Sequence, residues 1–145
     1  MSETLFIRSV RIEDAAAISH LMSQLGYPDT AEFMVRRIEA VLTDPMAECW
    51  VAEWQKGVAG VLSVNFIPQI ALAGDFARLS YFCIDELARG QSVGKKLLEK
   101  AESIARQRGC DRIEVHCHQR RVDAHRFYLR EGFSESPKYF IKSLS

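Results

Sequence analysis

The chain has 145 residues, 48% of them apolar, and its 19 basic side chains are balanced by 19 acidic ones. This length suffices for one well-buried core, so we expect a single domain over residues 1–145. A formal net charge of zero excludes the overall basic footprint of a nucleic-acid-binding protein, and no apolar stretch is long enough to span a bilayer. The N-terminus lacks the layout of a signal peptide, so we expect a cytoplasmic protein that binds neither nucleic acid nor membrane. The cysteines lack CxxC spacing and are expected to be buried free thiols: Cys49, Cys83, Cys110 and Cys117.

The first half of the chain is predicted to form a strand, two helices and a hairpin. Apolar residues at helical spacing indicate the helices, and Gly-Tyr-Pro at 26–28 and Asp-Pro at 44–45 end them. The turn at 55–57 separates two strand-like runs and is expected to close a hairpin. In chain order the expected elements are a strand at 5–10, a helix beginning at 13–14, a helix beginning at Asp29 or Thr30, and strands at 49–54 and 58–67.

The second half is predicted to alternate strands with helices. A nearly continuous apolar run at 77–84 indicates a buried strand, and a helix with apolar residues at helical spacing follows it. The remaining expected elements are the end of that helix near Gly109, a strand at 112–117, a short helix to Glu131 and a final strand around 139–141. The order β-α-α-β-β-β-α-β-α-β predicts an α/β or α+β sandwich, with a mixed, mostly antiparallel sheet flanked by helices.

A glycine-rich turn joins the strand at 77–84 to the helix after it. Gly90 and Gly94 lack a Cβ, so the backbone can turn sharply and approach a ligand with its N–H groups exposed. The helix N-terminus adds positive dipole at the same place, so an anion is expected to bind there. The turn is neither a Walker A loop, because Lys96 stands where Ser or Thr is needed, nor a Rossmann loop, which needs three glycines. A plain helix N-terminus with a glycine turn is the alternative interpretation.

A second motif lies at residues 121–133, after the strand at 112–117. Its defining residues are Ala124, Phe127, Tyr128, Gly132 and Phe133. Together with Arg89-x-x-Ser92-x-Gly94, this motif resembles the signatures of the GNAT superfamily of acyl-CoA N-acyltransferases, whose pyrophosphate loop reads Gln/Arg-x-x-Gly-x-Gly/Ala. Ser92 stands where the family usually has the middle glycine, and Arg121 stands where it has an Asn. The two motifs occur in family order, so the resemblance covers the whole chain and implies a GNAT-like fold.

The resemblance also implies that the chain uses acetyl-CoA as a co-substrate. Backbone groups of Phe82, Cys83 and Ile84 would hydrogen-bond the pantetheine arm, which enters where the fourth and fifth strands splay apart. Arg121 could contact phosphate or the adenylate through its guanidinium. The residues that would hold the pyrophosphate are Arg89, Gly90, Gln91, Ser92, Val93, Gly94 and Lys95.

The implied reaction is direct attack of a primary amine on the thioester, which needs a base for the ammonium proton and an acid for the leaving thiolate. Tyr128, at the family's tyrosine position, is the expected acid. His116, counted back from Tyr128 onto the fifth strand, is the leading candidate for the base because histidine titrates near neutrality. Asp85 and Glu86 compete for that role and could instead orient the amine. His116 and His118 could also be half-exposed strand residues or a metal pair, but no carboxylate-rich partner motif accompanies them, and we expect no metal.

The sequence does not reveal the acceptor amine. Family members differ in the first two helices and the loops beside them, so Tyr27 and the loop at 68–75 are expected to line the acceptor site, although Tyr27 could simply pack on the core. The acceptor is an unidentified small molecule or peptide, and a homodimer is left open. Two other classes also stay open, a non-catalytic acyl-CoA-binding regulatory domain on the same fold and a nucleotide-phosphate-binding interaction protein.

Overall fold

The computed structural model describes residues 4–55, 57–116, 121–136 and 140–144. The chain forms two compact units, Met1–Glu114 and Val115–Ser145, which are called the first and the second unit below. Among the residues described, no helix is long and apolar enough to cross a membrane.

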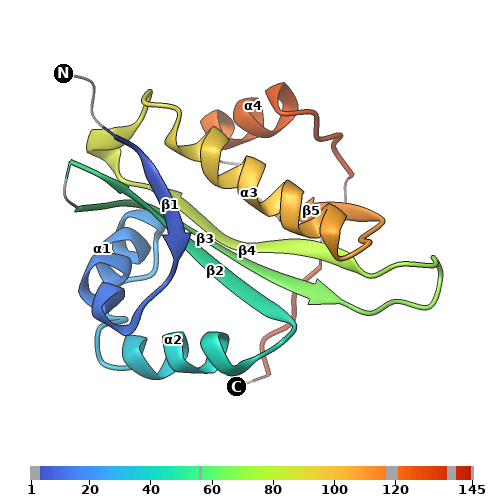
Figure 1. Ribbon diagram of the computed structural model, residues 1–145, viewed down its shortest axis with the longest axis horizontal. Helices are drawn as coiled ribbons and strands as arrows, with labels where there is room; N and C mark the ends of the chain where they lie inside the picture. The colour runs from blue at the N-terminus through green and yellow to red at the C-terminus, as the bar shows by residue number, and fades with distance from the viewer. Residues whose placement is uncertain (1–3, 56, 117–120, 137–139, 145) are drawn as a thin grey trace. The chain divides into compact units, whose positions relative to one another are not determined.

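The first unit is built on a sheet whose strand order follows the chain, β1-β2-β3-β4-β5 (Figure 1). The strands are β1 (Phe6–Ser9), β2 (Ala47–Trp54), β3 (Gly57–Ile67), β4 (Phe76–Ile84) and β5 (Arg112–Val115). The first four pair antiparallel. The starts of β4 and β5 lie together, because the Asp111 N–H donates to the Asp75 carbonyl at 2.8 Å. Three residues later in each segment, Glu114 forms an ion pair with Arg78. These two strands therefore run in the same direction, which confirms the predicted mixed, mostly antiparallel sheet.

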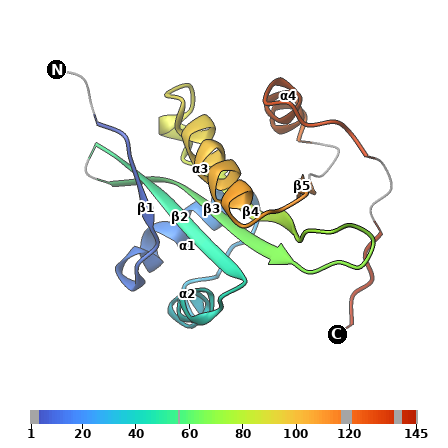
Figure 2. The same cartoon turned by 45° about the vertical axis from the view of Figure 1, so that its right-hand side comes forward.

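Helices cover both faces of this sheet (Figure 2). The helices α1 (Ala15–Leu25) and α2 (Met34–Thr43) lie on one face, and α3 (Val93–Gln107) lies on the other. Two short 3-10 turns, η1 (Ile12–Asp14) and η2 (Glu86–Ala88), precede α1 and α3. The core beneath α1 and α2 consists of Val10, Ile18, Leu21, Met22, Met34, Ile38, Val51, Val61 and Cys83.

The second helix begins at Met34, later than the expected start at Asp29 or Thr30. Asp29 has a left-handed backbone with φ of 63°, and residues 31–33 form a turn. A left-handed residue interrupts the repeating i→i−4 hydrogen bonds of a right-handed helix, so α2 can start only after it.

Gly60 on β3 allows the start of α3 to lie close against the sheet. A Cβ on Gly60 would stand 2.9 Å from Ile84 Cδ1 and 3.1 Å from side-chain atoms of both Val93 and Leu97. These separations are tighter than ordinary carbon contacts, so a larger residue at this position would force the side chains of Ile84, Val93 and Leu97 to shift. This close packing holds the start of α3, which follows the glycine-rich turn, against β3.

A buried ion pair ties β1 to the turn before α1. The Arg8 guanidinium donates to both carboxylate oxygens of Asp14 at 2.9 and 2.8 Å and to Glu53 on β2 at 3.0 Å. The backbone N–H of Arg11 donates to the same Asp14 carboxylate at 2.7 Å. Asp14 is only 6% exposed, so these donors replace the water that its charge has lost.

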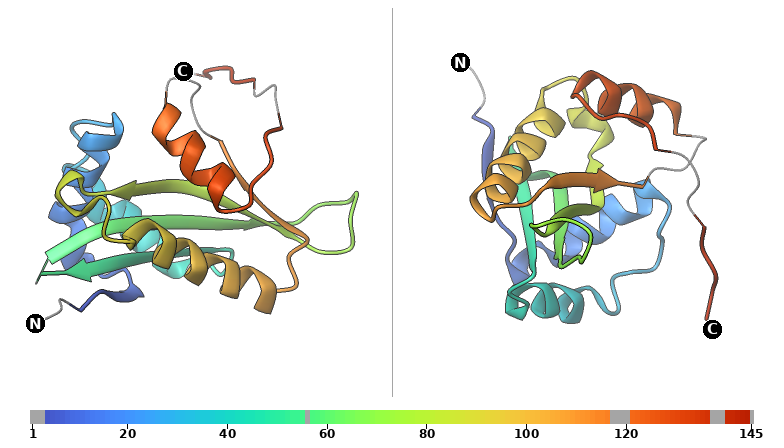
Figure 3. Two further views of the ribbon diagram at one scale, coloured as in Figure 1. Left: turned by 90° about the horizontal axis from the view of Figure 1, so that it is seen from above. Right: turned by 90° about the vertical axis from the view of Figure 1, so that its right-hand side faces the viewer.

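The connection between β3 and β4, expected to be a specificity loop at 68–75, reaches past the ends of neighbouring strands (Figure 3). Its end is pinned to the start of β5, because the Gly74 N–H donates to the Asp111 carboxylate at 2.7 Å. The Gln69 side chain closes the loop by donating to the Gly74 carbonyl at 2.7 Å.

The second unit contains α4 (Val122–Arg130). After this helix Gly132 turns the chain with φ of 96°, and the Phe133 N–H donates to the Tyr128 carbonyl at 2.9 Å. The expected strand around 139–141 is wrong for Phe140 and Ile141, which are exposed and outside any strand, whereas Tyr139 lies outside the described residues. Apolar residues favour a strand, but a strand forms only where a neighbouring strand pairs with its backbone.

Candidate active site

The glycine-rich turn presents unpaired backbone donors at the start of α3. Gly90 has φ of 85° and Ser92 has φ of 63°, so the chain turns sharply between η2 and the helix. The first i→i−4 bond of α3 runs from the Lys96 N–H to the Ser92 carbonyl at 3.1 Å. The N–H groups of Val93, Gly94 and Lys95 precede that bond and have no carbonyl partner within the helix. Such donors and the helix dipole suit an anion.

Ser92 occupies a conformation that glycine adopts at lower cost. Its backbone is left-handed, its side chain is exposed, and its hydroxyl does not cap the helix. This explains in physical terms why the family pattern has glycine at this position.

We predict that Ser92→Gly raises the free energy of unfolding by about 1 kcal/mol, because the left-handed backbone costs roughly that much for a residue with a Cβ. Urea unfolding monitored by circular dichroism checks the value. Acetyl-CoA affinity should be equal or better, since the backbone donors stay in place. A large loss of affinity would instead show that the hydroxyl is itself a ligand.

The expected pantetheine residues lie at the end of β4. Phe82, Cys83 and Ile84 pair across β3 with Leu62, Val61 and Gly60, respectively. The Cys83 thiol is buried and donates to the Leu21 carbonyl of α1 at 3.3 Å. Glu114 of β5 lies beside Arg78 of β4. Because β5 ends one residue after Glu114, the last residues of β4 extend beyond the end of β5.

A β-bulge in β4 lies just before these residues. Ser63 of β3 pairs with Tyr81 while Val64 pairs with Leu79, so Ser80 is the extra residue. The Ser80 hydroxyl hydrogen-bonds the Asn65 side chain. Bulges are common beside active sites because they redirect a side chain out of the regular alternation.

Tyr81, next to the bulge, was missed by sequence reasoning. Its ring lies edge-on to that of Tyr27, with 5.5 Å between centroids. Both side chains are about half exposed, at 45% and 51%. The structure thus brings the predicted acceptor residue Tyr27 against a residue of β4. The only sequence signal was a phenol within an otherwise apolar run.

Asp85 and Glu86 follow β4 and face α1. One Asp85 oxygen accepts from the Leu87 N–H at 2.9 Å and so caps η2, and the other lies 3.8 Å from His20 Nε2. The Glu86 N–H donates to the Gln24 side chain at 3.2 Å. One carboxylate oxygen of Asp85 therefore has a structural task, and the other faces the exposed imidazole.

His116 lies just after β5, whereas the sequence placed it within that strand. The His116 side chain is exposed. Glu114, two residues earlier and within β5, accepts from Arg112 at 2.7 Å and from Arg78 at 3.3 Å. Burial raises the pKa of Glu114, but these hydrogen bonds outweigh it and hold the pKa below its ordinary value. His118 lies outside the described residues, and among those described no three His, Cys, Asp or Glu side chains gather as a metal site requires.

Tyr128 belongs to an aromatic cluster in the second unit. Its side chain is 8% exposed, and its ring packs edge-to-face on Phe127 and Phe133 at 5.5 and 5.3 Å between centroids. Arg121 stands at the N-cap of α4, where its carbonyl accepts from the His125 N–H at 3.1 Å and its side chain makes no cap bond. An Asn could accept from the helix N–H groups at this position, but a guanidinium has no acceptor.

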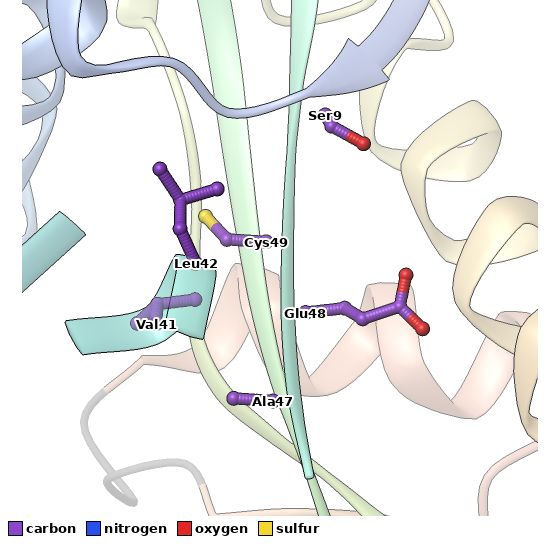
Figure 4. A pocket seen from close by; sticks show the side chains of 6 residues that line it. All are labelled: Ser9, Val41, Leu42, Ala47, Glu48 and Cys49. Atoms are coloured by element: carbon purple, nitrogen blue, oxygen red, sulfur yellow. The ribbon is translucent and has the colours of Figure 1, made fainter. Parts of the chain in front are cut away.

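A shallow pocket of about 150 Å³ lies elsewhere, between the end of α2 and β2 (Figure 4). Its lining residues are Ser9, Val41, Leu42, Ala47, Glu48 and Cys49. Figure 4 shows Cys49 pointing toward Leu42 and Glu48 pointing to the other side of β2. Burial raises the pKa of the Cys49 thiol to about 12, so this thiol is not a nucleophile at neutral pH. None of the predicted site residues lines this pocket.

Comparisons with known proteins identify the same family that the two sequence motifs indicate. Residues 15–133 match the sequence model of the acetyltransferase (GNAT) family. The aminoalkylphosphonate N-acetyltransferase of Salmonella typhimurium is 31% identical over 140 residues, which cover 95% of this chain and 90% of that protein. The glucosamine-6-phosphate N-acetyltransferase structure from Arabidopsis thaliana superposes with a TM-score of 0.85 at 23% identity, covering 98% of this chain and 99% of that one. An aminoglycoside N-acetyltransferase solved with CoA has a TM-score of 0.87 at 13% identity, covering 99% and 96% of the two chains.

Proposed function

The chain belongs to the GNAT family of acetyltransferases and is an acetyl-CoA-dependent N-acetyltransferase, and from this premise we propose which of its residues perform the transfer. Acetyl-CoA supplies an activated thioester. The chain must hold this co-substrate, position an amine beside it and handle two protons. Because the family match spans both units, we propose that they make up one acetyltransferase domain.

The observation that carries the cofactor assignment is the set of unpaired N–H groups at the start of α3. These donors, the positive φ of Gly90 and the nearby Lys95 fit a pyrophosphate, which carries several acceptor oxygens and negative charge. The loop from Arg89 to Lys95 would hold the diphosphate, and the end of β4 would hold the pantetheine. Arg121, with a side chain that does not cap α4, would contact a phosphate or the adenylate.

Proton handling is assigned to two side chains. Tyr128 would donate its phenolic proton to the sulfur of the leaving thiolate, and His116 would accept a proton from the attacking ammonium, directly or through water. Tyr27 and Tyr81 would line the acceptor site, and the Asp85 carboxylate would orient the amine. The relative from Salmonella typhimurium is named for aminoalkylphosphonates, so we propose a small aliphatic primary amine as the acceptor class.

Location and assembly complete the proposal. Among the described residues Cys49, Cys83 and Cys110 are free thiols, of which only Cys83 is fully buried, and Cys117 lies outside the described residues. A reducing compartment keeps thiols free, and we propose a cytoplasmic location. Assembly as a homodimer would be tested by light scattering.

We predict that acetyl-CoA raises the melting temperature of the protein and that Gly94→Val removes this effect. Gly94 is half-buried in the first turn of α3, and a valine side chain would fill the space through which phosphate approaches the backbone. A ligand at about one hundred times its Kd stabilises a protein by about 2.7 kcal/mol, which is readily seen in a thermal-shift assay.

The matched control is Gly57→Val, because Gly57 is the exposed first residue of β3 and nothing lies within 4 Å of a Cβ placed there. This variant should keep the full acetyl-CoA response. Unchanged acetyl-CoA affinity in a folded Gly94→Val protein would contradict the cofactor assignment. Acetyl-CoA binding without thiol release across a panel of amines would favour the non-catalytic alternative.

A further inference from the structure

Two guanidinium groups and one carboxylate gather on the sheet near the β4 bulge. Glu114 accepts from Arg112 Nε at 2.7 Å and from Arg78 Nη2 at 3.3 Å. The Arg112 guanidinium also lies over the Phe76 ring, 4.7 Å from its centroid. All three charged side chains stay partly exposed, with 44% of Arg112, 38% of Arg78 and 27% of Glu114 accessible.

The charges around this cluster come from Arg78, Arg112, Glu114 and the neighbouring Asp111. Glu114 is ionised at neutral pH, because its hydrogen bonds hold its pKa below the ordinary value. Its single charge offsets one of the two guanidinium groups, and the nearby Asp111 carboxylate, which accepts from the Gly74 N–H at 2.7 Å, keeps its own negative charge. The two guanidinium groups and these two carboxylates therefore nearly balance, and attraction for a further anion has to come from the geometry of one exposed guanidinium.

Arg78 is the less satisfied of the two guanidinium groups. Its bond to Glu114 is long for a charge-assisted hydrogen bond, and its Nε is buried without an acceptor. Arginine and carboxylate often make a two-fold contact in one plane, whereas Arg78 donates a single N–H to Glu114 and otherwise lies over the Phe76 ring, 5.5 Å from its centroid. The exposed end of the Arg78 guanidinium, and not its buried Nε, is where a second anion could bind.

Arg78 shares a face of the sheet with the proposed acceptor residues. It pairs across the strands with Asn65, whose side chain hydrogen-bonds Ser80, and directly paired residues lie on the same face. Tyr81 pairs with Ser63, two residues from Asn65 and hence on that face too. At about 3.3 Å per residue, Arg78 lies roughly 7–10 Å along β4 from Ser80 and Tyr81.

We propose that Arg78 binds an anionic group of the acceptor, while the amine of the same molecule lies by Tyr27 and Tyr81. The separation matches a short aliphatic chain between an amine and a phosphonate, phosphate or carboxylate. Glu114, itself held by Arg112, orients the Arg78 guanidinium, and the anionic group of the substrate accepts from the exposed N–H groups of Arg78. This inference rests on the proposed acetyltransferase function and adds the charge of its substrate.

The test compares three acceptors with wild type, Arg78→Gln and Arg78→Lys, following thiol release. The acceptors are 2-aminoethylphosphonate, β-alanine and the neutral propylamine. Arg78→Gln should raise the KM for the preferred anionic amine about ten- to a hundred-fold, the usual effect of losing a charged hydrogen bond, with propylamine kinetics and acetyl-CoA affinity unchanged. Arg78→Lys should recover part of the loss because it keeps a positive charge.

Arg106→Gln is the matched control, because Arg106 is an exposed side chain of α3, and it should leave all three acceptors unaffected. The ratio of phosphonate to carboxylate turnover identifies which anion the site accepts. If Arg78→Gln weakened the use of charged and neutral amines equally, or of none of them, the inference would be overturned while the acetyltransferase assignment would stand. Absence of thiol release with every amine in wild type would overturn the proposed function, and the inference with it.

Discussion

Replacing Tyr128 by phenylalanine should lower turnover about a hundredfold to ten-thousandfold while acetyl-CoA affinity stays nearly unchanged. That range is the usual contribution of a positioned general acid. The ring of Tyr128 is 8% exposed and packs on Phe127 and Phe133, and phenylalanine preserves this packing. The substitution deletes the hydroxyl, which carries the proton that the proposal assigns to the leaving thiolate. Steady-state kinetics and equilibrium binding of acetyl-CoA measure the two quantities separately.

A second variant separates the hydroxyl from the packing. Phe133→Leu removes one ring that touches Tyr128 but leaves the phenol, so it should reduce the melting temperature more than it reduces turnover. The assignment of Tyr128 as the acid fails if Tyr128→Phe changes turnover only about twofold, or if acetyl-CoA affinity falls in parallel with turnover.

Asp14→Asn should lower the free energy of unfolding by about 3–5 kcal/mol, the usual cost of removing one partner of a buried ion pair. The Arg8 side chain is only 9% exposed, and Asp14 accepts two of its N–H groups as well as the Arg11 N–H. Without the carboxylate, the Arg8 charge stays buried and keeps only its hydrogen bonds to Glu53 and to the Ser9 carbonyl, both at 3.0 Å. Equilibrium urea unfolding at neutral pH measures the loss.

Glu53→Gln is the control for this ion pair. The Glu53 side chain is 40% exposed and contributes one contact to Arg8, so solvent screens it and its removal should cost at most about 1 kcal/mol. If both variants lost the same free energy of unfolding, burial of the Arg8–Asp14 pair would not be what sets its contribution to stability.

The Asp14 contribution should also depend on pH. Burial raises the pKa of Asp14, but the hydrogen bonds from Arg8 and from the Arg11 N–H outweigh burial and place the folded pKa below the ordinary value. The contribution is therefore complete above the pKa of an unfolded aspartate, about 3.9, and is lost as pH falls through the lower folded pKa. The stability difference between wild type and Asp14→Asn should narrow below about pH 4. A difference that stays constant into strong acid would contradict this.

The sequence by itself determined the elements and the family. Helical spacing, helix-ending residues and the apolar run at 77–84 are local patterns, and they predicted the strand and helix order through α4 and the mixed sheet. The glycine-rich turn and the motif at 121–133 are also local, because phosphate binding at a helix start needs only neighbouring residues. Where a strand needs a distant partner, local patterns failed, as the exposed Phe140 and Ile141 show.

Only the tertiary structure decided which residues meet across the sheet. The bulge at Ser80 depends on the register between β3 and β4, and it brings Tyr81 against Tyr27 of a distant turn. The contact of Arg78 with Glu114 likewise depends on where β5 joins β4. In the sequence, Arg78, Tyr81 and Glu114 each resemble an ordinary strand residue. Their combined charge and exposure exist only after strand pairing, because electrostatic and aromatic contacts depend on distance in space and not along the chain.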